Sequence, residues 1–124
     1  MLVTTRQETD RKGEERRKNQ RFPFVAGAEV SEAGSRTKLS ATVSEISAHG
    51  CYLDMLNPLQ YGTNVSVKIF AGADSFEAAA TVVYSHPNLG LGVVFQDASQ
   101  ASLATLQKWL LEAMGTTDPA SGKR

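Results

Sequence analysis

Cysteine is almost absent from this chain, which contains only Cys51, so no internal disulfide can form and nothing indicates an oxidising compartment. Long apolar runs are missing as well. No stretch approaches the roughly 18 apolar residues of a transmembrane helix, and residues 1–10 lack the apolar segment of a secretory signal. We therefore expect a cytoplasmic protein without membrane insertion.

Residue types that often carry catalysis or bind metals are also scarce. The two histidines, His49 and His86, have no cysteine or acidic pair at ligand spacing, so each is expected to be a turn residue. Cys51 begins an apolar segment, where a buried and unreactive thiol is expected. No carboxylates are paired in a way that favours acid–base chemistry. We expect no catalytic residue, no metal site and no cofactor.

Net charge is zero, with 13 basic and 13 acidic residues, but the two signs are unevenly distributed. Residues 1–22 hold seven basic and four acidic groups, a net charge of +3. The remaining 102 residues hold six basic and nine acidic groups, a net charge of −3. This asymmetry suggests an anionic partner that binds at the N-terminal end.

The chain is long enough for one domain with a substantial core. Residues 4–21 contain no apolar side chain and cannot contribute to that core, so residues 1–21 are expected to form a flexible basic arm. The folded domain is expected over residues 22–115. Residues 116–124 are expected to form a disordered polar tail.

Between residues 22 and 96, apolar and polar residues alternate with a period of two, interrupted by turn residues. This pattern predicts six strands, at about 23–32, 37–46, 51–56, 64–70, 74–85 and 89–96. Short antiparallel strands at this spacing favour a closed barrel, because closure removes the exposed edges that promote aggregation. The predicted fold is all-β, a six-stranded antiparallel barrel, with one C-terminal helix.

The helix is predicted over about residues 98–114. Asp97 and Gln100 have the spacing of a capping box, and Gly115 is expected to end the helix. The helix is expected to cover one mouth of the barrel, with Trp109 packed at the junction. Its apolar residues recur at helical spacing: Leu103, Leu106, Leu110 and Ala113.

Two arginines of the arm, Arg17 and Arg21, lie four positions apart. Each guanidinium offers a planar fork of donors that fits two phosphate oxygens or the O6 and N7 atoms of guanine, and it can stack on a base. In an extended arm, residues four apart point the same way, so both can address one ligand. Two arginines in a basic segment are also readily explained as solvated charge.

A second group of residues, Glu45, Ser47 and Gly50, lies where a predicted strand turns. Glycine lets another group pack against bare backbone, and the serine hydroxyl can donate and accept. The carboxylate of Glu45 can accept from the N1–H and N2–H₂ groups of guanine, a pair of donors that adenine does not present. Alone, this segment is equally compatible with an ordinary hairpin turn.

Together, the two groups resemble the PilZ family of bacterial receptors for cyclic di-GMP. The family pattern is Arg-x-x-x-Arg in an N-terminal arm, followed by Asp/Asn-x-Ser-x-x-Gly on the barrel. Here Arg17 and Arg21 match the first part, and Ser47 and Gly50 match the second.

Other segments support this resemblance, which covers about residues 16–113. Gly50-Cys51-Tyr52-Leu53 continues the second motif, and residues 89–95 are similar to the family's late glycine-rich strand. The resemblance implies a Greek-key-like barrel.

The resemblance also implies a non-enzymatic receptor. Cyclic di-GMP would dock at Ser47 and Gly50, Arg17 and Arg21 would close over it, and the closed arm would offer a new surface to an unidentified protein partner. Arg16 matches family members that look able to hold a stacked pair of ligand molecules, so binding of one or of two molecules stays open.

Glu45 departs from the family pattern, which has Asp or Asn at this position. The extra methylene moves the carboxylate about 1.5 Å further out. A misplaced charge-assisted hydrogen bond would cost about 1.5–3 kcal/mol, which corresponds to about ten- to a hundredfold in affinity.

Two alternative functions stay open. Glu45 favours a PilZ-like module that has lost the nucleotide and binds proteins of motility or pilus assembly. The other alternative is a small-barrel nucleic-acid binder, which would need exposed aromatic residues on its strands. Phe70, Phe76 and Phe95 fall on positions predicted for the core or its edges, so we do not expect nucleic acid as a partner.

Overall fold

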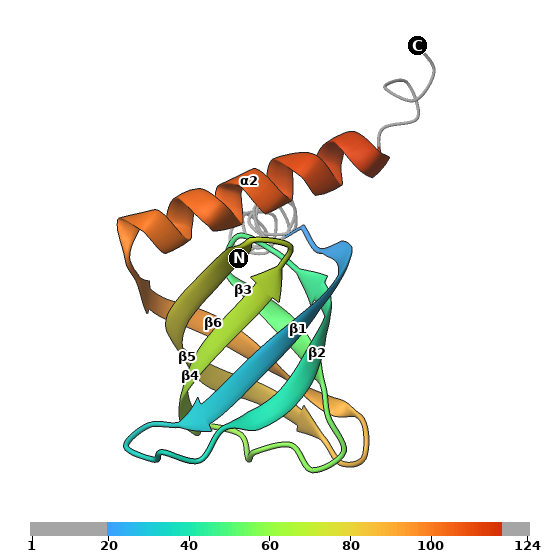
Figure 1. The fold of residues 1–124 in the computed structure, drawn as a ribbon. Coiled ribbons are helices and arrows are strands. Elements are labelled where there is room, and N and C mark those ends of the chain that lie inside the picture. Colours follow the sequence, from blue (N-terminus) through green and yellow to red (C-terminus); the bar gives the residue numbers. More distant parts are fainter. Residues whose placement is uncertain (1–19, 118–124) are drawn as a thin grey trace, which may run out of the picture.

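The computed structural model describes residues 20–117, which form a closed six-stranded barrel with one helix lying across its end (Figure 1). The strands are β1 (Phe22–Glu32), β2 (Leu39–Ile46), β3 (Gly50–Asp54), β4 (Asn64–Ala71), β5 (Asp74–His86) and β6 (Gly90–Ala98), and the helix is α2 (Gln100–Thr117). The predicted fold class is confirmed, and each strand boundary lies within two residues of its expected position. The predicted arm and tail fall mostly on residues 1–19 and 118–124, outside the described residues.

Around the barrel, the strands follow the order β1-β2-β3-β6-β5-β4, and β1 pairs with β4 to close it. Every neighbouring pair is antiparallel. β3 pairs with β6 rather than with β4, so the chain crosses over once instead of running up and down in sequence. This crossover agrees with the Greek-key-like arrangement expected from the resemblance.

The barrel interior is filled by alternate residues of the strands, because successive side chains of a strand point to opposite faces of the sheet. On β5, for example, Phe76, Ala78, Ala80 and Val82 are buried, as the period-two pattern predicted. The largest fully buried side chains come from all six strands: Phe76, Ile46, Leu53, Ile69, Leu91, Val30, Val43, Val67 and Val82.

The N-terminal cap of α2 differs from the predicted one. Ser99 caps the helix, because its Oγ accepts a hydrogen bond from the amide of Ser102 at 3.1 Å. The prediction that Asp97 is the cap is wrong, since β6 continues further than expected and Asp97 pairs with Ala79 of β5. The helix also continues past Gly115 to Thr117, three residues beyond its predicted end.

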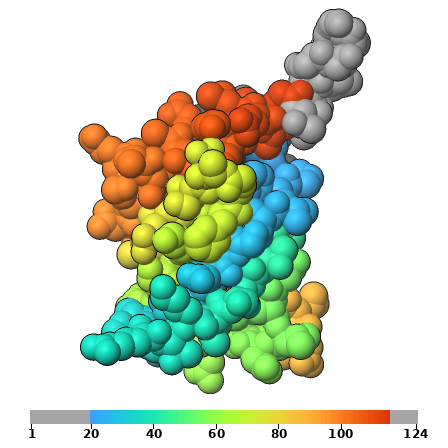
Figure 2. Space-filling view, viewed as in Figure 1, coloured from blue at the N-terminus to red at the C-terminus, as the bar shows by residue number. Residues whose placement is uncertain are grey.

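The helix covers one end of the barrel, as predicted, and packs on β1 and β5 (Figure 2). Leu106 and Trp109 are buried, and the Trp109 ring lies 5.2 Å from the ring of Phe24 on β1. Lys108 adds an ion pair to Asp74 of β5 at 2.8 Å. Leu103, expected on the packed face, is instead exposed, because the contact face is centred on Leu106 and Trp109.

Within residues 20–117, no helix is long enough and apolar enough to cross a membrane.

Replacing Trp109 with alanine tests how the helix is attached. Loss of this buried indole should lower the free energy of unfolding by about 3–5 kcal/mol, because a cavity would open beside Phe24. Leu111, which is 59% exposed on the same helix, is the matched control. Leu111→Ala should change the free energy of unfolding by less than about 0.5 kcal/mol. Urea denaturation measures both values, and equal losses would contradict the packing of the helix on the barrel.

Candidate functional site

The turn between β2 and β3 is held by the Ser47 side chain. Its Oγ accepts hydrogen bonds from the amides of His49, at 3.2 Å, and Gly50, at 3.1 Å. The backbone amide of Ser47 also donates to the Gly50 carbonyl at 2.9 Å. Ser47 is buried, and its hydroxyl proton has the Gly50 carbonyl as its acceptor at 3.3 Å. Ser47 therefore shapes the turn first, and only its single O–H donor can be redirected to a ligand.

Gly50 is required by close backbone packing. It pairs with Val94 of β6, and a Cβ at this position would overlap the carbonyl oxygen of Val93. Next to it, the amide of Phe95 donates to the carbonyl of His49 at 2.7 Å. The glycine was expected to let a ligand approach the backbone, but the group that approaches it closely is the neighbouring strand. Gly50 thus fixes the turn against β6.

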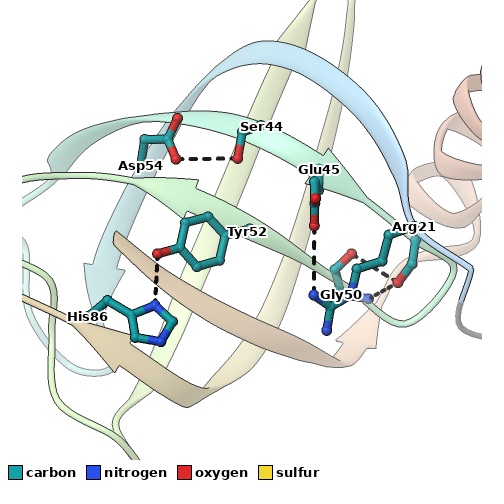
Figure 3. Close-up of polar contacts among 8 residues, drawn as sticks. Arg21, Ser44, Glu45, Gly50, Tyr52, Asp54 and His86 are labelled. Atoms are coloured by element: carbon teal, nitrogen blue, oxygen red, sulfur yellow. Dashed lines mark hydrogen bonds and ion pairs between the residues drawn. The ribbon is translucent and has the colours of Figure 1, made fainter. Parts of the chain in front are cut away.

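Arg21 and Glu45 meet beside this turn (Figure 3). They come together because β1 pairs with β2 so that Phe22 lies opposite Ile46 and Pro23 opposite Glu45. The Arg21 Nη1 and Glu45 Oε1 atoms are 3.7 Å apart, and the two side chains are 57% and 49% exposed. An exposed ion pair of this length contributes about 0–1 kcal/mol, so Arg21 is held only weakly.

Arg21, Glu45, Ser47 and Gly50 line one hollow of about 290 Å³, called here the turn hollow. The structure therefore gathers four of the six residues that the sequence predicted for the site. The other two, Arg16 and Arg17, lie outside the described residues.

A larger groove adjoins the turn hollow on the outer surface of the barrel. It has a volume of about 680 Å³ and is called here the aromatic groove. Its lining consists of Arg21, Ser44, Glu45, Tyr52, Tyr84, His86 and Leu89. Arg21, Glu45, Tyr52 and Tyr84 line both spaces, so the two are continuous. Sites for small molecules commonly occupy about 300–1,000 Å³, which the two together match.

The aromatic groove contains a ring cluster that was not predicted from the sequence. The ring centroids of Tyr52 on β3 and Tyr84 on β5 are 6.0 Å apart, and those of Tyr84 and His86 are 5.5 Å apart. The Tyr52 hydroxyl is 3.0 Å from Nδ1 of His86 (Figure 3). Burial, and to a smaller extent the nearby Asp54 and Tyr84, raises the pKa of the Tyr52 hydroxyl.

The sequence predicts the face of the sheet on which Tyr52 lies, but it does not predict the face of Tyr84. Tyr52 lies between the buried residues Cys51 and Leu53, so strand alternation alone would have directed it outward. Tyr84 follows the buried Val82 by two positions, so the same rule directs it inward. The structure has a register shift between Val82 and Tyr84, and this bulge turns Tyr84 to the outside.

The remaining expectations for single residues concern the two histidines and Cys51. His49 is exposed in the β2–β3 turn, as predicted. His86 is the last residue of β5, and its carbonyl accepts from the Leu89 amide at 3.0 Å to close the following turn, so its predicted place at a turn is confirmed. Its ring belongs to the ring cluster, which was not predicted. Cys51 is buried, as expected, and its burial raises the pKa of the thiol to about 12, which suppresses the nucleophilic thiolate.

Substituting Gly50 tests its structural role. Gly50→Ala should lower the free energy of unfolding by about 2–3 kcal/mol or more, because the added Cβ meets the rigid backbone of β6. Gly27 of β1 is the matched control, since a Cβ there has no atom within 4 Å. Gly27→Ala should change the value by less than about 1 kcal/mol. Denaturation curves that show equal effects would contradict the close contact at Gly50.

Comparison with known proteins places the chain in a family. The PilZ domain family matches residues 15–112. No curated protein matches the chain.

Solved structures share the fold at low sequence identity. The PilZ domain of CeSA from a cellulose-synthesizing bacterium has a TM-score of 0.60 and 16% identity, over 80% of this chain and 99% of that one. The PilZ domain of YcgR from Escherichia coli, solved with c-di-GMP, has a TM-score of 0.68 and 14% identity, over 88% and 99%. The Bacillus subtilis inhibitor of motility MotI/DgrA has a TM-score of 0.67 and 15% identity, over 83% of this chain and 53% of that one. With a six-stranded barrel, a C-terminal helix and a family match over most of its length, the chain belongs to the PilZ domain family.

Proposed function

We propose that this protein is a non-enzymatic receptor for cyclic di-GMP that binds the nucleotide at the turn hollow and the aromatic groove. The observation that carries the proposal is the meeting of Arg21, Glu45, Ser47 and Gly50 around one hollow, although they come from separate segments of the chain. The PilZ domain of YcgR, which shares the fold, was solved with this ligand.

The negative charge of the ligand suits Arg21, the one arginine among the described residues that lines the turn hollow and the aromatic groove. Cyclic di-GMP carries two phosphates, and Arg21 can donate to two oxygens of one of them. In the proposed mechanism, Arg17 of the arm supplies the second fork. Arg21 directly precedes β1, so closure of the arm would bring Arg17 toward the same hollow.

Glu45 has two opposing effects in this mechanism. Its carboxylate can accept from the N1–H and N2–H₂ groups of a guanine base, which would favour guanine over adenine. It also lies 3.7 Å from Arg21 and competes with a phosphate for that guanidinium. The ligand must therefore replace an existing ion pair, which contributes little because both side chains are about half exposed.

Ligand binding would become a signal through the arm. Fixing an arm residue costs about 1–2 kcal/mol of conformational entropy, so charge-assisted contacts must exceed that cost. Those contacts weaken as salt screens them. The closed arm would then present a new surface to a protein partner, and no chemical reaction is required.

A PilZ-like interaction module without nucleotide binding is the second candidate. Its supporting observation is the Arg21–Glu45 contact, in which a carboxylate already occupies the guanidinium that should hold a phosphate. It differs from the receptor by a single measurable property, the affinity for the nucleotide.

Exposed aromatic residues favour the nucleic-acid alternative, but the scarcity of basic residues beside them opposes it. Phe76 and Phe95 pack together at 4.8 Å, as expected, but Phe70 is exposed and the tyrosines of the aromatic groove lie on the outer face. Among the described residues, however, Arg21 is the only lysine or arginine that lines either space. A polynucleotide needs a basic track along its backbone, which this part of the chain does not provide.

Calorimetric titration of cyclic di-GMP tests the proposed function. The wild-type protein should bind, and Arg17→Ala/Arg21→Ala should lose at least about a hundredfold in affinity, because two charge-assisted contacts are removed. Arg36→Ala is the matched control, since Arg36 is exposed in the loop before β2, at the other end of that strand from the Ser47 turn. It should bind like the wild type.

Each other result has a clear meaning. No heat with the wild type would establish the non-binding module instead. Equal affinity of the wild type and the double variant would show that the arginines have no part in binding. Heat with a single-stranded oligonucleotide, in place of the dinucleotide, would support the nucleic-acid alternative.

Shortening Glu45 tests the competition for Arg21. Glu45→Asp withdraws the carboxylate by about 1.5 Å and restores the residue type of the family pattern. Affinity for cyclic di-GMP should rise by about two- to fivefold. Glu29→Asp is the control. Glu29 of β1 forms a similar exposed ion pair with Lys38 at 3.8 Å, and it lines neither the turn hollow nor the aromatic groove. Weaker binding by Glu45→Asp would show that the longer reach of glutamate is needed.

A further inference from the structure

The side of α2 that faces away from the barrel carries apolar residues. Figure 1 shows α2 lying across the end of the barrel, so one long side of the helix is directed away from the strands. Leu103 and Leu111 lie on that side and are 49% and 59% exposed. Between them lies Gln107, which is also exposed. These three residues, Leu103, Gln107 and Leu111, are called here the outer strip.

The charged residues of α2 do not interrupt the outer strip. The helix contains only two of them, Lys108 and Glu112, among its 18 residues. Lys108 forms an ion pair with Asp74 of β5, so it lies on the flank of the helix, and Glu112 follows one turn later on the same flank. The solvent side of a surface helix normally carries charge. An exposed apolar strip without it is typical of an interface.

The outer strip is self-complementary about Gln107. At 100° per residue, Leu103 and Leu111 lie about 40° to either side of Gln107 and about 6 Å before and after it along the helix axis. A twofold axis at Gln107 would therefore bring Leu103 of one copy to the same level as Leu111 of the other, and the reverse. Such a contact uses the same residues on both copies, as an interface with twofold symmetry requires.

Charge and area also bear on association between copies. The outer strip has no charge with which to attract a charged partner and none with which to repel an identical copy. The chain as a whole has zero net charge, so two copies meet no long-range repulsion. One helix face on each copy reaches only the low end of specific interfaces, about 1,200 Å² in total. We therefore expect a dissociation constant of about 10–100 μM, with the monomer predominant in dilute solution.

We propose that the outer strip of α2 is the surface through which two copies of this chain associate, as an antiparallel pair of helices with a twofold axis at Gln107. The two Gln107 side chains face each other there. Each has a donor and an acceptor, so they can bond to one another and fix the alignment of the helices. This inference goes beyond the proposed function, because the outer strip shares no residue with the turn hollow or the aromatic groove.

Sedimentation equilibrium over about 5–500 μM protein tests the association. The wild type should change from monomer to dimer across this range. Leu111→Glu should weaken association at least about tenfold, because a carboxylate would enter an apolar contact. Glutamate is a good helix former and Leu111 is exposed, so the variant should still fold. Leu56→Glu is the matched control, since Leu56 is 72% exposed in the loop after β3, and it should associate like the wild type.

Introduced cysteines test the antiparallel alignment. Helix axes about 10 Å apart would place the two Cα atoms of residue 107 about 5.4 Å apart, within the disulfide range of about 4.4–6.8 Å. Gln107→Cys should therefore form a disulfide-linked dimer when dissolved oxygen oxidises the paired thiols, as a non-reducing gel would show. Gln100→Cys is the matched control on the same helix, because its two copies would lie about 21 Å apart along the axis. It should stay unlinked, as should the wild type, whose Cys51 is buried.

Three results would overturn the proposal. One is a wild-type protein that stays monomeric up to about 500 μM, which is also the result expected if residues 1–3 of the same chain or a different protein cover the outer strip. Another is association that Leu111→Glu leaves unchanged. The third is a disulfide that forms at residue 100 as readily as at residue 107. All of these measurements are made without cyclic di-GMP, so none of them bears on the receptor function.

Discussion

The barrel and its candidate site both depend on the backbone contact between the start of β3 and β6. Gly50 pairs with Val94 at a distance that leaves no room for a side chain, and the Phe95 amide donates to the His49 carbonyl at 2.7 Å. The Ser47 hydroxyl holds the turn that leads into this contact. With the turn fixed, the pairing of β1 with β2 sets Arg21 beside Glu45. The rigid part of the site therefore follows from barrel closure, and the polar side chains around it are comparatively free.

Strand alternation was sufficient to predict most of the fold. It placed Phe76, Ala78, Ala80 and Val82 in the core, and the family resemblance agrees with the crossover that sets β6 beside β3. The ends of α2 could not be predicted in the same way, because Asp97 and Ser99 are both good capping residues. The length of β6 decides between them, and that length is set by pairing with β5 rather than by the local sequence.

The site could be predicted only where strand pairing follows the regular pattern. The motif residues Arg21, Glu45, Ser47 and Gly50 meet around one hollow, and the resemblance had suggested this grouping. The outward position of Tyr84 was not predicted, because one extra residue in β5 reverses the face on which Tyr84 lies. The alternation rule assumes that no such residue is present. The strand partner of Tyr84, Gly92, gave no signal either, because a glycine in a strand has several explanations.

The structure also divides the motif residues by the reason for their presence. Ser47 and Gly50 are demanded by the turn and by β6, whether or not a nucleotide binds, so a relative that had lost its ligand would still need them. Glu45 is about half exposed and supports no part of the core, so aspartate and glutamate are equally compatible with the barrel there. The departure from the family pattern at Glu45 therefore has no consequence for folding. Arg21, Glu45 and Tyr84 differ from Ser47 and Gly50 because their side chains line both open spaces and take no part in holding the turn.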